Sequence, residues 1–216
     1  IHQNASGMLN LVNDILDIAK LQAGKFEISV QPGDMGEIIE NRIKFFEVSA
    51  LDKKIKLKSI VSPSMSKTAM FDSLRIKEVL NNLISNAIKF TKEKETISII
   101  AFEHQADADP EAELKKLKVN LPAALPKDAF AKFPDSIVVV VSHPDEGIPP
   151  EQIGELFNKF KQLNNKDFVT NVKGTGLGLA IVKGIVEEHK GHVGAVSTTG
   201  VGTAFYFVLP LSGGRA

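Results

Sequence analysis

The chain has 216 residues and a mass of 23.5 kDa, enough for one domain of good size with an appendage. Its 26 basic and 26 acidic residues balance, which argues against a nucleic acid partner or attraction to an anionic membrane surface. It has no cysteine, so disulfides and thiolate zinc sites are excluded.

Residues 5–24 predict an amphipathic helix, because apolar residues recur at spacings of three and four. These residues are Met8, Leu11, Val12, Ile15, Ile18, Ala19 and Leu21. Gly24 is typical of a helix end. Two interpretations stay open: the helix packs on its own domain, or it stands apart behind a linker at 25–33 and needs another helix or a partner chain. The start at Ile1, in mid-pattern, indicates a piece of a longer protein.

The remainder alternates between two periodicities. Helical spacing predicts helices over 35–54, 72–92, 151–160 and 178–189, with Leu74, Val79, Leu80, Leu83, Ile84 and Ala87 forming the apolar stripe of the second. Strands are predicted over 55–61, 95–103, 135–142, 192–198 and 203–211, the last two as an antiparallel hairpin around the turn at 199–202. Helices mixed with antiparallel strands predict an α+β fold, a two-layer α/β sandwich. No apolar run approaches the ~20 residues that cross a bilayer.

One stretch, at about 104–134, does not fit a compact core. Long irregular connections are uncommon and are usually functional or disordered. Pro110 at a first turn predicts a short helix inside it. We interpret this stretch as a surface insertion, with a partner-binding element as the alternative.

Two motifs carry candidate chemistry. Asn82 and Asn86 lie four apart on one helix, with Lys89 beside them; amide oxygens suit a metal, and amide and ammonium donors suit phosphates. The alternative is a solvated helix face. The string "GTGLGL" at 174–179 opens into an apolar helix, where glycines and free N–H groups favour an anion. Alone it is weak evidence, and it fits neither a dinucleotide fingerprint nor a P-loop.

Together these segments resemble the C-terminal ATP-binding part of the sensor histidine kinases, in the gyrase/Hsp90/histidine kinase/MutL superfamily. "NNLISNAIKFT" is similar to the N box, "GIPPEQIGELFNKF" to the end of the G1 box and the F box (Phe157 and Phe160), "GTGLGLAIVKGIVEEHKGHV" to the G2 box, and "GVGTAFYFVLP" to the closing strand. The opening "LVNDILDIAKLQAGKFE" is similar to the second helix of the dimerisation and histidine-phosphotransfer domain.

The resemblance implies a Bergerat-type sandwich at 34–213, preceded by a dimerisation helix at 1–24, and it implies ATP and Mg²⁺ as cofactors. Asn86 would coordinate Mg²⁺ with Asn82 assisting, Lys89 would contact phosphate, Phe90 would line the nucleotide pocket and Thr203 would sit near the adenine edge. Residues 163–173 would form a lid that is ordered when nucleotide is present. The phosphates would be wrapped by Gly174, Thr175, Gly176, Leu177 and Gly178.

The phosphoacceptor histidine of the family is absent. It belongs to the preceding helix and is followed by an acidic residue and a proline, and His2 lacks that context. The resemblance therefore implies a kinase whose phosphoacceptor lies outside this chain.

The second departure lies at the adenine anchor, an aspartate in the family pattern Asp-x-Gly-x-Gly-Ile-Pro. Counted back without gaps from Gly147, His143 takes the aspartate position and Asp145 that of the first glycine. Losing one buried polar contact costs ~1–3 kcal/mol, about tenfold to a hundredfold in affinity, so in this register we expect weak or absent ATP binding. In a second register Asp145 is itself the aspartate, two residues on and therefore on the same strand face. We favour the gapless register because it keeps "GIPPE" intact.

The sequence thus predicts a cytoplasmic kinase domain, transferring the γ-phosphate of ATP to a histidine for relay to a response regulator receiver. It would be homodimeric through the helical domain and attached to a membrane only through upstream regions. The alternative is a degenerate pseudokinase acting as a scaffold or allosteric partner. A third reading, an ATPase or anti-sigma-type serine kinase of the same superfamily, is disfavoured by the first helix.

Overall fold

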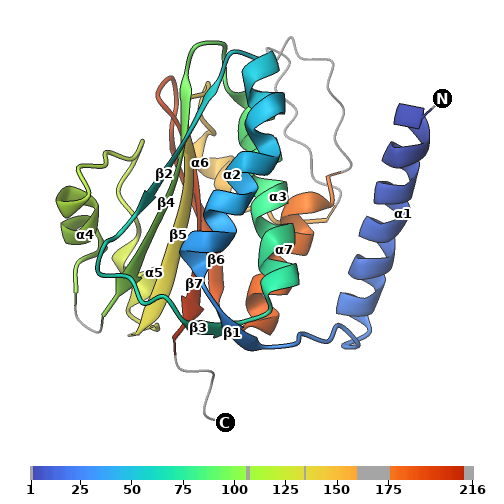
Figure 1. The fold of residues 1–216 in the computed structure, drawn as a ribbon, viewed down its shortest axis with the longest axis horizontal. Helices are drawn as coiled ribbons and strands as arrows, with labels where there is room; N and C mark the ends of the chain where they lie inside the picture. Colours follow the sequence, from blue (N-terminus) through green and yellow to red (C-terminus); the bar gives the residue numbers. More distant parts are fainter. Residues whose placement is uncertain (1, 106–107, 134, 160–175, 212–216) are drawn as a thin grey trace.

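A computed structural model describes residues 2–105, 108–133, 135–159 and 176–211. Within these residues the structure has fourteen helices and strands, most of which match a predicted element (Figure 1). In chain order they are α1 (His2–Gln22), β1 (Gln31–Gly33), α2 (Met35–Asp52), β2 (Lys56–Val61), β3 (Ala69–Phe71), α3 (Ser73–Phe90), β4 (Thr96–His104), α4 (Pro110–Lys116), α5 (Lys127–Phe130), β5 (Ser136–His143), α6 (Pro150–Ile153), α7 (Gly178–Glu188), β6 (His192–Thr198) and β7 (Gly202–Pro210).

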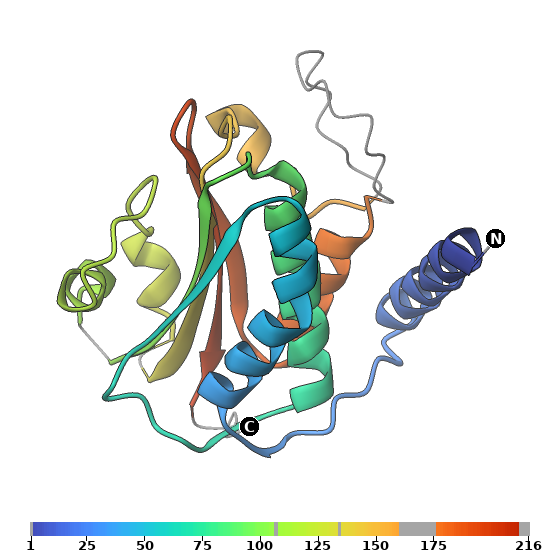
Figure 2. The ribbon, with the colours of Figure 1, turned by 45° about the horizontal axis from the view of Figure 1, so that its top comes forward.

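The large sheet has the strand order β2-β4-β5-β7-β6, and α2, α3 and α7 cover one of its faces (Figures 1 and 2). This arrangement confirms the predicted two-layer α/β sandwich. All neighbouring strands in this sheet are antiparallel except β2 and β4, which are parallel. The parallel pair follows from the helical crossover, α3, that separates the two strands in the chain. A small ribbon of β1 and β3 was not predicted.

The main core lies between the sheet and the three helices. Helix α3 contributes a continuous stripe of buried residues to this core: Ile76, Val79, Leu80, Leu83, Ile84, Ala87 and Ile88. Burying one such aliphatic side chain contributes about 1.5–3 kcal/mol. Leu74 does not belong to this stripe, contrary to the prediction, since it is 71% exposed on the first turn. Asp72 caps the helix by accepting from the N–H groups of Leu74 and Arg75.

The insertion covers part of the other face of the sheet, so the expectation that it lies outside a compact core is wrong. The predicted short helix within it is α4, which begins with Pro110 and is capped by Asp109. Apolar insertion residues pack with outward-facing residues of β4, β5 and β7 in a second buried cluster. That cluster comprises Ile100, Phe102, Leu114, Leu125, Phe130, Val138, Val140, Ala204, Tyr206 and Val208. The physical reason is the valine run of β5, which presents apolar side chains to both faces and needs cover on each.

Helix α1 lies beyond the helix layer, on the side of α7 (Figures 1 and 2). Ile18 is buried near its C-terminal end. Leu21 fills the space beside Gly184 of α7, where an added Cβ would come within 2.4 Å of its side chain. The helix therefore packs partly on its own domain, while Leu11, Val12, Ile15 and Leu16 stay exposed.

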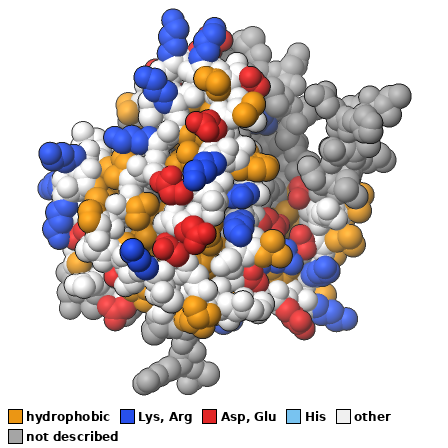
Figure 3. Space-filling view, in the orientation of Figure 1, with side chains coloured by type: hydrophobic (Ala, Val, Ile, Leu, Met, Phe, Trp, Pro, Cys, Tyr) orange, Lys and Arg blue, Asp and Glu red, His pale blue; other side chains and the backbone are white. Residues whose placement is uncertain are grey.

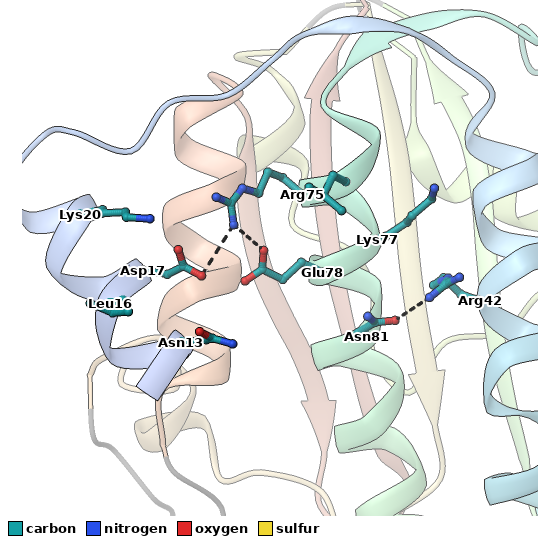
Figure 4. Close-up of a pocket in the computed structure, with 10 residues that line it drawn as sticks. Asn13, Leu16, Asp17, Lys20, Arg42, Arg75, Lys77, Glu78 and Asn81 are labelled. Atoms are coloured by element: carbon teal, nitrogen blue, oxygen red, sulfur yellow. Dashed lines mark hydrogen bonds and ion pairs between the residues drawn. The ribbon is translucent and has the colours of Figure 1, made fainter. Parts of the chain in front are cut away.

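A polar contact adds to this packing (Figure 4). Arg75 on α3 forms ion pairs with Glu78, at 2.9 Å, and with Asp17 of α1, at 3.6 Å. Its guanidinium also lies 4.3 Å from the ring centroid of Phe26, in the linker after α1. Asp17, Arg75 and Glu78 help to line a groove of about 450 Å³ bounded by α1, α2 and α3.

The surface drawn in Figure 3 mixes basic and acidic side chains, with apolar ones scattered among them. None of the helices in the part of the chain described is long and apolar enough to span a membrane.

Helix α6 is shorter than predicted: it ends at Ile153, and Gly154 occupies its C-cap.

Candidate nucleotide-binding site

A row of polar side chains lies at one end of the sheet, on the face that is covered by the helices. His143 on β5 pairs in register with Thr203 on β7, and Thr203 pairs with Ser197 on β6. Their side chains point to the same face as Val141 and Phe205, which belong to the main core, because side chains alternate along a strand. Ser197 Oγ lies 3.0 Å from Thr203 Oγ1. Three neighbouring strands thus bring polar groups together at the point where the apolar core stops.

The carboxylate of Asp145 lies against this row. Its Oδ1 accepts hydrogen bonds from the Thr203 hydroxyl, at 3.0 Å, and from the N–H of Gly147, at 2.8 Å. Its Oδ2 lies 3.2 Å from Nε2 of His143. Burial alone would raise the pKa of Asp145, but the hydrogen bonds from His143, Gly147 and Thr203 outweigh it and hold that pKa below its usual value. The group is therefore a buried, ionised carboxylate, with its side chain 9% exposed.

The loop that carries Asp145 is held mainly against the β6–β7 hairpin. Gly147 has a φ of +73°, and an added Cβ would come within 2.4 Å of the Thr198 carbonyl oxygen. The N–H of Ile148 donates to Ser197 Oγ. On the other side, Glu146 forms an ion pair with Lys92, just past α3. The β6–β7 hairpin therefore sets the position of the carboxylate, and the exposed ion pair to the end of α3 adds little to it.

Helices α3 and α7 meet beside this loop. The amide nitrogen of Asn82 donates to the Glu78 carbonyl oxygen, at 3.2 Å, and its Oδ1 faces Gly178. A Cβ on Gly178, the first residue of α7, would lie 2.7 Å from that Oδ1. The N-cap residue Leu177 provides no side-chain cap, so the first N–H groups of α7 suit an anionic ligand. Asn86 lies one turn along α3, half-buried.

The end of α3 carries the predicted cation. Burial lowers the pKa of Lys89, and the nearby charge of Lys53 lowers it further. The Lys89 ammonium lies 5.0 Å from the ring centroid of Phe90, which is partly exposed. Lys53 itself donates to the carbonyl oxygen of Ile88 and covers the C-terminus of the helix. Lys89 is thus a half-buried cation that forms no ion pair with the residues the structure describes.

Several predicted residues lie outside the described part of the chain: Gly174, Thr175, Phe160 and the lid at 163–173. Gly176 is described and has a φ of +71°, which favours glycine. Sequence reasoning missed Ser197, whose hydroxyl bonds Ile148, Thr203 and the Gly202 carbonyl oxygen. The signal was available, because Ser197 follows Val193 and Ala195 on the core-facing side of a strand.

The geometry defines a class of protein: a sandwich with a buried carboxylate just past the end of a strand, together with a helix that carries Asn82 and Asn86 and the glycine-rich start of a second helix. Residues 71–213 match the family model described as "Histidine kinase-, DNA gyrase B-, and HSP90-like ATPase". The chain belongs to this family, and the resemblance to sensor histidine kinase catalytic domains is confirmed.

Two curated relatives of the chain are also sensor proteins of this family. The chain is 32% identical over 200 residues to Drug sensory protein A of Synechocystis, covering 92% of this chain and 26% of that protein. It is 29% identical over 213 residues to Sensor histidine kinase GacS of Pseudomonas protegens, covering 98% of this chain and 20% of that one. The chain therefore spans about a quarter or less of these relatives.

Among solved structures, full-length ShkA in complex with AMPPNP superposes with a TM-score of 0.73 at 25% identity. The match covers 99% of this chain and 38% of that one. A protein of similar fold therefore holds an ATP analogue.

Proposed function

We propose that this domain binds ATP with Mg²⁺ and transfers the γ-phosphate to a histidine on a dimerisation helix outside this chain, for relay to a response regulator. The observation that carries the proposal is the buried, ionised carboxylate of Asp145. An isolated carboxylate is costly to bury, and here three donors and a fixed loop hold it in place. A carboxylate held in this way is suited to recognising a ligand.

We assign adenine recognition to Asp145, the second of the two registers. A carboxylate has about four acceptor positions. Gly147 and Thr203 fill both positions on Oδ1, and His143 fills one on Oδ2. One position on Oδ2 remains for the exocyclic amino group of adenine. His143 holds the strand-end place of the family aspartate, but its Nε2 is turned to Asp145.

The phosphate groups belong, in this proposal, at the start of α7 and the face of α3. N–H groups at the helix start stabilise negative charge. Lys89 adds a cation, and Asn82 presents an oxygen towards Gly178. Mg²⁺ would be held by Asn86, with Asn82 nearby, and would neutralise charge that develops on the phosphates. The described residues contain no cluster of three acidic or histidine side chains; a magnesium ion that keeps waters and phosphate oxygens as ligands needs none.

The domain would otherwise only need to position the γ-phosphate next to the acceptor histidine. Phosphoryl transfer depends on alignment and on charge stabilisation, and it needs no covalent bond to this domain. The exposed apolar residues of α1 (Leu11, Val12, Ile15 and Leu16) support a homodimeric helical bundle. We propose that a receiver domain takes the phosphoryl group from that bundle.

The alternative is a degenerate kinase, and one observation favours it. His143 replaces the expected anchor, and three of the acceptor positions on Asp145 are already occupied. If adenine cannot use the fourth position, the domain keeps its fold without its ligand and acts as a scaffold or allosteric partner.

Calorimetric titration with a non-hydrolysable ATP analogue, with and without Mg²⁺, separates the two functions. We expect a dissociation constant below ~100 µM, equivalent to more than about 5 kcal/mol of binding energy, and weaker binding without Mg²⁺. An Asn86→Ala variant should lose the Mg²⁺ dependence. If the folded protein gives no heat of binding with the analogue at millimolar concentration, the domain is a degenerate kinase. In a longer version that includes the phosphoacceptor helix, acid-labile label from γ-labelled ATP would report the transfer.

A further inference from the structure

We infer that His143 is a positioning residue for base recognition: it holds Oδ2 of Asp145 in the orientation that accepts the exocyclic amino group of adenine. The inference rests on the proposed function, and it gives His143 a role in adenine selectivity. Its basis is the burial, the ring contacts and the hydrogen-bonding capacity of this one side chain.

The imidazole ring is held rigidly. Its side chain is 1% exposed. The ring lies nearly parallel to Phe205, with an interplanar angle of 11° and a centroid separation of 6.3 Å. Phe205 is in turn contacted edge-on by Phe157 at 6.4 Å. A ring stacked in this way cannot turn away from Asp145 without disturbing the core beneath it.

The surroundings also select one tautomer. Nδ1 of His143 is buried and has no hydrogen-bond partner among the described residues, whereas Nε2 faces Oδ2 of Asp145. A proton on Nδ1 alone would leave an orphaned donor and would turn the Nε2 lone pair against the carboxylate. A proton on Nε2 makes the hydrogen bond and leaves only an unfilled lone pair on Nδ1. His143 is therefore a fixed donor to Oδ2.

This donor limits how Oδ2 can be used. Thr203 and Gly147 already hold Oδ1, so the plane of the carboxylate is set by groups on both oxygens. The remaining acceptor position on Oδ2 then has one direction. An amino group at position 6 of a purine can donate to it, whereas a 6-oxo group presents an acceptor and is rejected.

The test compares ATP with inosine triphosphate (ITP), which carries the same ribose and phosphates but a 6-oxo group. His143→Leu keeps an apolar side chain against Phe205 and removes the donor, and His143→Gln keeps a donor. We expect ATP affinity to fall about tenfold in the leucine variant, the size of one lost charge-assisted hydrogen bond, with ITP affinity little changed. The ATP-to-ITP ratio should therefore fall about tenfold, and the glutamine variant should restore most of it.

Two controls make the result decisive. Melting temperatures establish that each variant is folded. In an Asp145→Asn background, His143→Leu should change the ATP-to-ITP ratio no further, because the two residues act through one contact. An equal loss of ATP and ITP binding, or an unchanged ratio in the leucine variant, overturns the inference. A folded wild type that binds neither nucleotide refutes the proposed function itself, and the inference falls with it.

Discussion

Gly147 provides a sharp test of how the carboxylate loop is built. Its φ of +73° is unfavourable for any residue with a Cβ, and that Cβ would meet three backbone atoms of Thr198 and Thr199 within 2.8 Å. Backbone atoms of a paired hairpin cannot move aside as a flexible side chain can. Gly147→Ala should therefore carry two separate penalties, one from the backbone conformation and one from the collision.

The chain offers a matched control for each penalty. Gly200 has a φ of +77° with nothing within 4 Å of the added Cβ, so Gly200→Ala isolates the conformational penalty, about 1–2 kcal/mol. Gly154 has a φ of −63° and open space, so Gly154→Ala should be neutral or slightly stabilising. The collision adds about 1–3 kcal/mol, by analogy with overpacking. Gly147→Ala should therefore lose about 2–5 kcal/mol in total.

Thermal unfolding measures these differences. For a chain of this size each 1 kcal/mol lowers the melting temperature by about 2–4 °C, so we expect the order Gly154→Ala, Gly200→Ala, Gly147→Ala, with the last lowest by several degrees. Binding of an ATP analogue should also weaken only in Gly147→Ala, because its N–H holds Asp145. Equal melting temperatures for Gly147→Ala and Gly200→Ala would refute the collision argument.

Three further predictions follow from single contacts. Gly178→Ala should weaken binding of an ATP analogue about tenfold in calorimetry by displacing Asn82, without lowering the melting temperature, since alanine favours a helix by about 0.5–1 kcal/mol; unchanged binding would contradict it. Gly184→Leu should expel Leu21 from α7 and speed proteolysis after α1 several-fold; unchanged cleavage would mean that this contact does not hold α1. Because hydrogen bonds hold the pKa of Asp145 below 3.8, its contribution to the free energy of unfolding is present above that pH and lost as pH falls through the lowered value. The difference between wild type and Asp145→Asn in urea denaturation, about 1–3 kcal/mol at neutral pH, should shrink below pH 3.8, and a constant difference would contradict it.

Local patterns were enough to predict most of the fold. The stripe of α3 and the alternation of β6 are set by residues whose neighbours in sequence share their environment, so periodicity identifies them. Leu74 shows the limit: it fits the helical spacing, but it lies in the first turn of α3, where it is 71% exposed and lines the groove bounded by α1, α2 and α3. The cover on the second face escaped prediction because Leu114, Leu125 and Phe130 show no shared period.

At the site, the sequence predicted the end of β5 and the turn at Gly147, whereas Gly174 and Thr175 of the other glycine-rich segment lie outside the described residues. The sequence favoured His143 over Asp145 as the adenine anchor, and we propose Asp145. That choice depends on how a side chain folds back across a loop. The backbone pairing of His143 with Thr203 and the side-chain bond from Thr203 to Asp145 are both long-range contacts. The alternation of β6 places Ser197 on the core-facing side, but its partners Ile148 and Thr203 lie across the sheet and are known only from the fold.

The cover over the second face has a consequence for how the domain opens. Strand β5 is central in the sheet, with Val139 and Val141 in the main core and Val138 and Val140 under the insertion. Its amide hydrogens bond to β4 and β7 and meet solvent only when these central strands part, which also requires both covering layers to come away, whereas those of the edge strands β2 and β6 can exchange by local fraying. Hydrogen exchange at β5 should therefore track unfolding of the whole domain, and removing the insertion should speed it by lowering the free energy of unfolding.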